Sequence, residues 1–171
     1  IRNGGAVAVS ARDKSQVNAI AGGIAASGSS GTGTSVSGQV GAAFALNKIA
    51  NSTRATIEDS AISSQSTTTL TAIEDADVLA VAIGFAAGGS GSSGLAIQFS
   101  VGGSMVANEI VNVTEASILG ASSVSGTSNI TLDADDSSTI TALGGGASGG
   151  GAGGAGGQIF NIGKSKAQVY D

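Results

Sequence analysis

The stretch Asn47-Lys-Ile-Ala-Asn-Ser-Thr-Arg-Ala-Thr-Ile57 recurs as Asn108-Glu-Ile-Val-Asn-Val-Thr-Glu-Ala-Ser-Ile118, with six identities at one offset of 61. Weaker matches on both sides extend the similarity into three incomplete copies of a repeat, at approximately 1–46, 47–107 and 108–171. Repeats of this size are typical of stacked architectures in which each unit contacts only its neighbours. The sequence therefore predicts one domain over 1–171.

A shorter spacing lies inside the long one. Around Thr53-x-Ala55-x-Ile57, for example, apolar residues alternate with polar ones, which is the two-residue period of a strand with one buried face. Aliphatic β-branched residues recur in steps of 19 to 22 and form the series Val17, Val36, Ile57, Val78, Ile97, Ile118, Ile140 and Ile159. We interpret each step as one coil and the series as a core ladder through about eight coils of about 20 residues.

These patterns predict an all-β protein, a parallel β-solenoid whose coils lie about 4.8 Å apart and form a rod about 40 Å long. A right-handed β-helix is favoured because parallel crossover connections are overwhelmingly right-handed, and a left-handed form remains open. The chain contains no Pro, which fits a ladder of hydrogen bonds that continues on both sides of each strand.

Composition narrows the possible functions. The net charge of −5 and the lack of a basic cluster argue against nucleic-acid binding. The absence of His and Cys removes the usual zinc ligands and the commonest general base, so we expect no enzyme activity. No apolar run is long enough to span a membrane, and the first residues match neither a signal peptide nor a start methionine. We expect a segment of a longer chain.

Acidic residues cluster at equivalent places in the copies. They are Glu74, Asp75 and Asp77 in the second copy and Asp133, Asp135 and Asp136 in the third, with Asp13 at the matching place in the first. Hard carboxylate oxygens suit Ca²⁺, so these residues are weak candidates for a calcium site. A solvated corner is the preferred interpretation, because neither an EF-hand loop nor a calcium-binding nonapeptide is present. No other cofactor is predicted.

Asn and Gly are predicted to form the corners of the coils. Asn47, Asn51, Asn108 and Asn112 recur with the repeat and are interpreted as turn residues, since Asn tolerates left-handed backbone geometry. With three short coils between equivalent residues, about 14 Å, we expect no hydrogen bond between them. Glycine-rich stretches at 22–33, 84–94 and 144–157 are interpreted as corners or side loops with positive φ.

The segments 41–57 and 102–118 resemble the stalk repeats of filamentous-haemagglutinin-like adhesins and of large autotransporter passengers of bacteria. The resemblance implies a large secreted, extracellular or cell-surface β-solenoid protein in which this segment is a stiff stalk for adhesion or biofilm matrix. It implies no catalytic residues. The partners it implies are neighbouring repeats of the same chain and a receptor that the sequence does not identify.

Two alternatives remain open at this stage. The chain could be a self-assembling subunit of an extracellular filament, sheath or surface layer, because terminal coils expose unpaired strand edges. A minor alternative is an ice-binding solenoid, suggested by the Thr residues of 67–71 and 139–141, although Thr is also a common strand residue on a solvated face.

Overall fold

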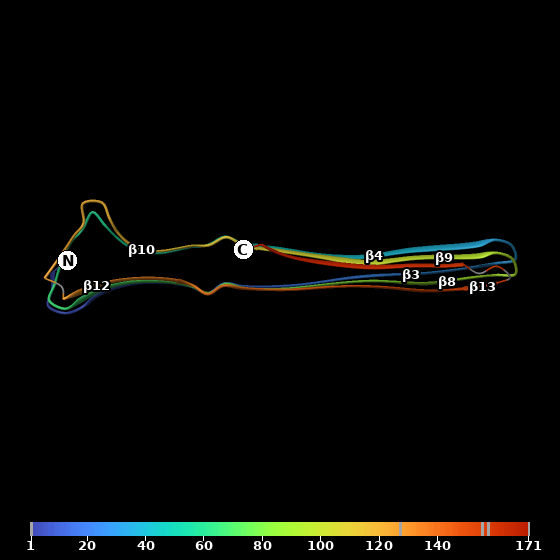
Figure 1. Cartoon of the computed structure of the whole chain (residues 1–171), viewed down its shortest axis with the longest axis horizontal. Coiled ribbons are helices and arrows are strands. Elements are labelled where there is room, and N and C mark those ends of the chain that lie inside the picture. The colour runs from blue at the N-terminus through green and yellow to red at the C-terminus, as the bar shows by residue number, and fades with distance from the viewer. Residues whose placement is uncertain (1, 127, 155, 157, 171) are drawn as a thin grey trace.

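In a computed structural model the chain forms a stack of long, flattened coils (Figure 1). The structure describes residues 2–126, 128–154, 156 and 158–170. The strands are β1 (Arg2–Asn3), β2 (Val7–Asp13), β3 (Gln16–Gly31), β4 (Ser35–Ile49), β5 (Ser52–Glu58), β6 (Ala61–Ser64), β7 (Thr67–Glu74), β8 (Asp77–Ser92), β9 (Ala96–Ile110), β10 (Val113–Leu119), β11 (Ser123–Ser125), β12 (Asn129–Asp136), β13 (Thr139–Gly153) and β14 (Gln158–Tyr170).

Every strand pairs in parallel with the strand one repeat away. The resulting sheets have the orders β1-β6-β11, β12-β7-β2, β13-β8-β3 and β14-β9-β4, with a two-stranded sheet of β5 and β10. Val17 pairs with Val78, for example, and Val78 pairs with Ile140. The prediction of an all-β parallel β-solenoid built on the long repeat is confirmed.

The prediction of eight short coils is wrong, because the long repeat is itself one coil. Asn47 and Asn108, at an offset of 61, lie directly beside each other on paired strands. The strands β3 and β4 are 16 and 15 residues long, so a predicted short coil holds little more than one strand and cannot close a loop. Three coils at about 4.8 Å each give a stack about 14 Å deep, not the rod of about 40 Å expected from eight. The repeat boundaries after residues 46 and 107 fall inside β4 and β9, since a repeat can be divided at any phase.

The predicted core ladder consequently divides into separate rows. Val17, Val78 and Ile140 form one inward row, and Ile57 and Ile118 form another, packed into the core. Val36 and Ile97 pair with each other, but Val36 is 62% exposed and belongs to the outer face, so its placement in the core was wrong. Ile159 pairs with Gln98 rather than Ile97, and its side chain lies outside the described residues.

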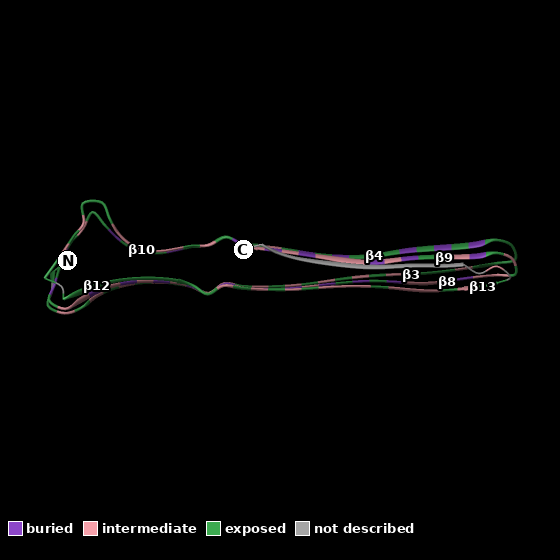
Figure 2. Cartoon of the chain, viewed as in Figure 1, coloured by how far each residue is buried: buried purple, intermediate pink, exposed green. Residues whose placement is uncertain are grey.

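Each coil has a wide half and a narrow half. We call the narrow half, formed by β3, β8 and β13 on one side and β4, β9 and β14 on the other, the blade (Figure 1). Larger aliphatic residues such as Ile57, Ile62 and Leu70 fill the wide half. The blade core consists of Ala43, Ala45, Ala80, Ala82 and Val106. Figure 2 shows buried and exposed residues alternating along β4.

Glycine allows the two blade sheets to lie unusually close together. A Cβ atom added at Gly84 would lie 1.7 Å from the carbonyl oxygen of Gly103, and one at Gly23 would lie 1.9 Å from that of Ala42. The prediction that the glycine-rich stretches 22–33, 84–94 and 144–157 form corners is wrong, because most of their glycines lie inside strands. Of the described glycines, only Gly120, Gly126 and Gly154 have positive φ.

Farther along the blade the interior is polar but hydrogen-bonded. Gln98 is fully buried, and its Nε2 donates to Oε1 of Gln39 at 2.6 Å. Oγ of Ser37 donates to Oε1 of Gln98 at 2.6 Å, and Oγ of Ser100 donates to Oε1 of Gln39 at 2.8 Å. Buried amides are stable when they are paired in this way. The network joins two adjacent coils within the β4-β9-β14 sheet.

Candidate functional site

The acidic cluster lies where the wide half of the coil narrows into the blade, a region we call the waist. Strand pairing places Asp13, Glu74 and Asp136 in one row across the three coils. Glu74 is fully buried, and it accepts hydrogen bonds from Oγ1 of Thr53 and from Nδ2 of Asn51, the latter at 3.0 Å. The interior of the waist is thus closed by a carboxylate whose oxygens already have protein partners.

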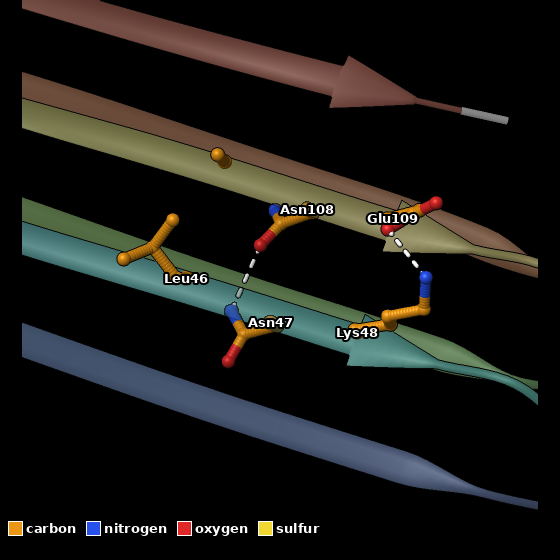
Figure 3. Close-up of a pocket in the computed structure, with 6 residues that line it drawn as sticks. Leu46, Asn47, Lys48, Asn108 and Glu109 are labelled. Atoms are coloured by element: carbon orange, nitrogen blue, oxygen red, sulfur yellow. Dashed lines mark hydrogen bonds and ion pairs between the residues drawn. The ribbon is translucent and has the colours of Figure 1, made fainter.

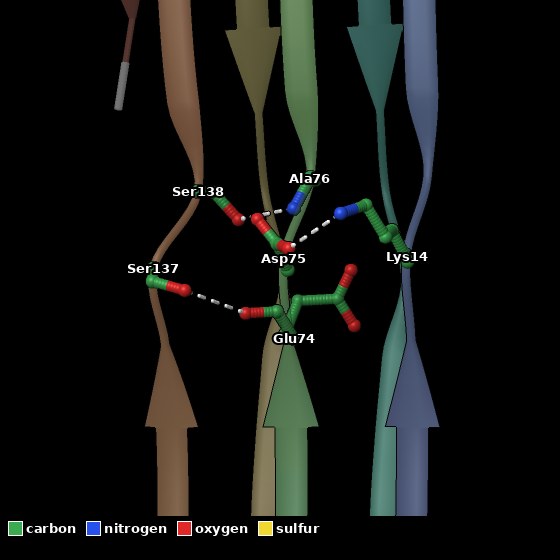
Figure 4. Close-up of polar contacts among 6 residues, drawn as sticks. All are labelled: Lys14, Glu74, Asp75, Ala76, Ser137 and Ser138. Carbon is green, nitrogen blue, oxygen red and sulfur yellow. Dashed lines mark hydrogen bonds and ion pairs between the residues drawn. The ribbon is translucent and has the colours of Figure 1, made fainter.

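The remaining waist residues also have partners within the protein. Oδ2 of Asp75 forms an ion pair with Nζ of Lys14 at 3.4 Å (Figure 4). Oδ1 of Asp136 accepts hydrogen bonds from the backbone N of Ser138, at 3.0 Å, and from its Oγ. The backbone N of Asp77 donates to the carbonyl oxygen of Ser15 at 2.8 Å. The Lys14–Asp75 ion pair and the Asp77–Ser15 hydrogen bond join adjacent coils at the waist.

The other calcium candidates, Asp133 and Asp135, lie on β12 and are exposed. They pair with Thr71 and Ile73 of β7, so they belong to the outward positions of that sheet, away from the row that contains Glu74. Within the described part of the chain, no three carboxylate, His or Cys side chains lie close enough together to hold a metal ion. The alternation of strand faces separates residues that are adjacent in the sequence.

The repeated asparagines form hydrogen bonds between adjacent coils. Asn47 and Asn108 lie within β4 and β9, and Nδ2 of Asn47 donates to Oδ1 of Asn108 at 2.8 Å (Figure 3). The expectation that they lie in turns and cannot reach each other is wrong, because an offset of 61 is one coil. Asn51 and Asn112 lie between strands, and the backbone N of Asn51 donates to Oδ1 of Asn112 at 3.3 Å.

Ion pairs between adjacent coils were missed in the sequence. Nζ of Lys48 lies 2.9 Å from Oε2 of Glu109, beside the pair of Asn47 and Asn108 (Figure 3). The four side chains line a surface hollow. Arg54 and Glu115 form a second pair at 3.4 Å. Both have the same offset of 61, as does Lys14 with Asp75, so the reversal of charge between equivalent positions was the signal. Such exposed pairs contribute at most about 1 kcal/mol each and help to set the register.

No family model matches the chain, and no curated protein or solved structure matches it. Strand pairing alone therefore establishes the parallel β-solenoid fold. No helix long and apolar enough to cross a membrane occurs in the part of the chain that the structure describes.

The threonines do not form a regular array. Thr69 lies in a row with Ala8 and Thr131, whereas the row of Thr71 contains Ser10 and Asp133. A surface that matches an ordered water lattice would repeat the same side chain across the coils. The described geometry gives no support to the ice-binding alternative.

The outer faces of the blade carry large apolar side chains. Ile20 and Ile24 point outward from β3, and Val40 and Phe44 point outward from β4. Sequence reasoning missed these faces because large aliphatic residues were assigned to the core. The signal was the intervening Ala and Gly residues, which are too small to fill a core of ordinary thickness but fit between two closely spaced sheets.

Proposed function

We propose that the chain is a structural segment of a large secreted or cell-surface bacterial protein, whose coils build a rigid body rather than an active site. The observation that supports this best is the uniform stacking of three equivalent coils joined by strand pairing, asparagine hydrogen bonds and ion pairs at the same offset. The resemblance of 41–57 and 102–118 to adhesin stalk repeats supports the extracellular location and a role in adhesion or biofilm matrix.

The coil geometry gives a wide stack rather than a long one. A coil with a repeat offset of 61 rises by about 4.8 Å, or about 0.08 Å per residue, whereas coils a third as long would give about three times more length for the same chain. In return, the long strands of the two blade sheets, such as β3 and β4, give the stack two wide faces. We infer that this segment contributes stiffness and surface rather than length.

Tandem copies of the chain test the stacking part of the proposal. Tyr170 is in register with Glu109 and Arg2 with Ser63, so a second copy of 111–123 placed between two chains continues the phase of the repeat. Each added chain is expected to extend the stack by about 14 Å while the broad dimension stays constant. Electron microscopy of two-, three- and four-copy fusions measures this. Fusions in which each chain forms a separate particle, instead of one continuous stack, would contradict the proposal.

The location is tested independently. Antibodies raised against the chain are expected to label intact, unpermeabilised cells that produce the protein. Labelling only after permeabilisation would exclude the extracellular role but would leave the coil stacking unchanged.

A further inference from the structure

The outer face of the sheet β3-β8-β13 is broad, apolar and almost free of charge. Its exposed large side chains are Ile20, Ile24, Leu79, Ile83, Phe85 and Leu143. Apart from Asp77 at the waist, the three strands contain no charged residue. Exposed apolar patches larger than a few hundred Å² are rare on soluble monomers and mark interaction surfaces.

The relief of this face is regular because strand pairing aligns equivalent positions. Ile83 lies between Gly22 and Gly145 and is 54% exposed, so it projects from a strip that is otherwise bare. The neighbouring row of Ile24, Phe85 and Ala147 forms a ridge beside it. A face with alternating ridges and glycine troughs can interdigitate with an identical face turned by a two-fold rotation.

We propose that the β3-β8-β13 face binds the same face of a second copy of this chain, which pairs the two blades side by side. Strands of 15 to 16 residues at about 3.3 Å per residue, in a sheet about 14 Å wide, give a face of about 700 Å². Two such faces bury about 1,400 Å² together, which lies within the size range of specific protein–protein interfaces.

The chemistry of the face favours a second copy over other partners. Anionic membrane surfaces attract basic residues, and these strands contain no Lys or Arg. Phe85 is the one aromatic residue in the three strands, too few for a carbohydrate platform. The opposite outer face carries Lys48 and Glu109 and is therefore less suited to an uncharged, self-complementary contact. The pairing goes beyond the proposed function, since it does not depend on an extracellular location.

Sedimentation velocity over a range of protein concentrations tests the pairing. The unmodified chain is expected to dimerise with a dissociation constant in the micromolar range or lower, as interfaces of this size do. Ile83→Glu and Ile24→Glu would each bury an unpaired carboxylate at the contact and are expected to raise the dissociation constant by at least about a hundredfold. Ile24 is 83% exposed in one copy, so this substitution leaves the fold of the single copy intact, as far-UV circular dichroism can check.

Two matched substitutions identify the face. Thr69→Glu lies at an outward position of β7, the central strand of a sheet in the wide half, and is expected to leave association unchanged. Phe44→Glu lies on the opposite blade face and is expected to do the same. The proposal would be overturned if the unmodified chain stayed monomeric at all concentrations, or if its dimers survived both isoleucine substitutions. It would also be overturned if Phe44→Glu dissociated the dimers, or if a chain that does not self-associate bound phosphatidylcholine vesicles.

Discussion

Replacing Gly23 with Ala is a direct test of the close packing between the two blade sheets. Gly23 lies on the inner face of β3, and the added Cβ would lie 1.9 Å from the carbonyl oxygen of Ala42 on β4. Contacts shorter than 3.0 Å are essentially never found for a real Cβ atom. The two sheets must therefore separate locally by at least 1.1 Å, the difference between 3.0 and 1.9 Å.

The expected loss of stability follows from the rigidity of the obstacle. Overpacking a protein core costs about 1–3 kcal/mol, and sometimes more, when neighbouring groups must move. Here the neighbour is backbone that is itself paired with β9, so we expect a loss of about 3 kcal/mol or more. Gly22, the preceding residue, faces outward with nothing within 4 Å of its added Cβ. Gly22→Ala is expected to be neutral or stabilising by up to about 1 kcal/mol.

Urea denaturation followed by far-UV circular dichroism measures the difference between these two variants. With a denaturant dependence of about 2 kcal/mol per molar, a difference of about 3 kcal/mol separates the two midpoints by about 1.5 M. Equal midpoints for Gly22→Ala and Gly23→Ala would refute the idea that glycine sets the distance between the sheets.

Three further predictions concern the wide half and the waist. Leu70 is fully buried in the middle coil, whereas its row neighbour Leu132 is 47% exposed. Leu70→Ala should therefore lower the free energy of unfolding by about 2–5 kcal/mol, and Leu132→Ala should lower it by clearly less. Equal urea midpoints for the two variants would contradict the stacking. Glu74→Ala leaves two hydrogen-bond donors in the waist without their acceptor and should lower the free energy of unfolding by about 3 kcal/mol. Replacing the exposed Glu58 with Ala, as a control, should change it by less than about 0.5 kcal/mol. An unchanged stability of Glu74→Ala would show that the buried carboxylate is dispensable. Excess EDTA or millimolar CaCl₂ should leave the thermal midpoint in scanning calorimetry unchanged, because the described carboxylates are not assembled into a metal-binding group; a calcium-dependent rise would point to a site.

The difference between the predicted and observed coil shows the limit of periodicity as evidence. In long strands, apolar residues occur at every second position, so a series with steps near 20 can be drawn through several unrelated rows. Val36 and Val78 belong to the same series but lie on opposite faces of their sheets, one outward and one inward. The offset of 61 was reliable because it rests on identities along a continuous stretch, which strand pairing later joins residue by residue.

The sequence alone determined the all-β class, the parallel stacking and the long repeat, because adjacent coils must place similar side chains one above the other. It also identified the asparagines and carboxylates that recur with the repeat, but not their contacts. Only the tertiary structure decided which side of each blade strand faces inward. Alternation shows that a strand has two faces but does not show which of them is buried. The opposite sheet decides this, because it lies so close that Gly and Ala fit between the sheets, and Ile24 and Ile83 face outward.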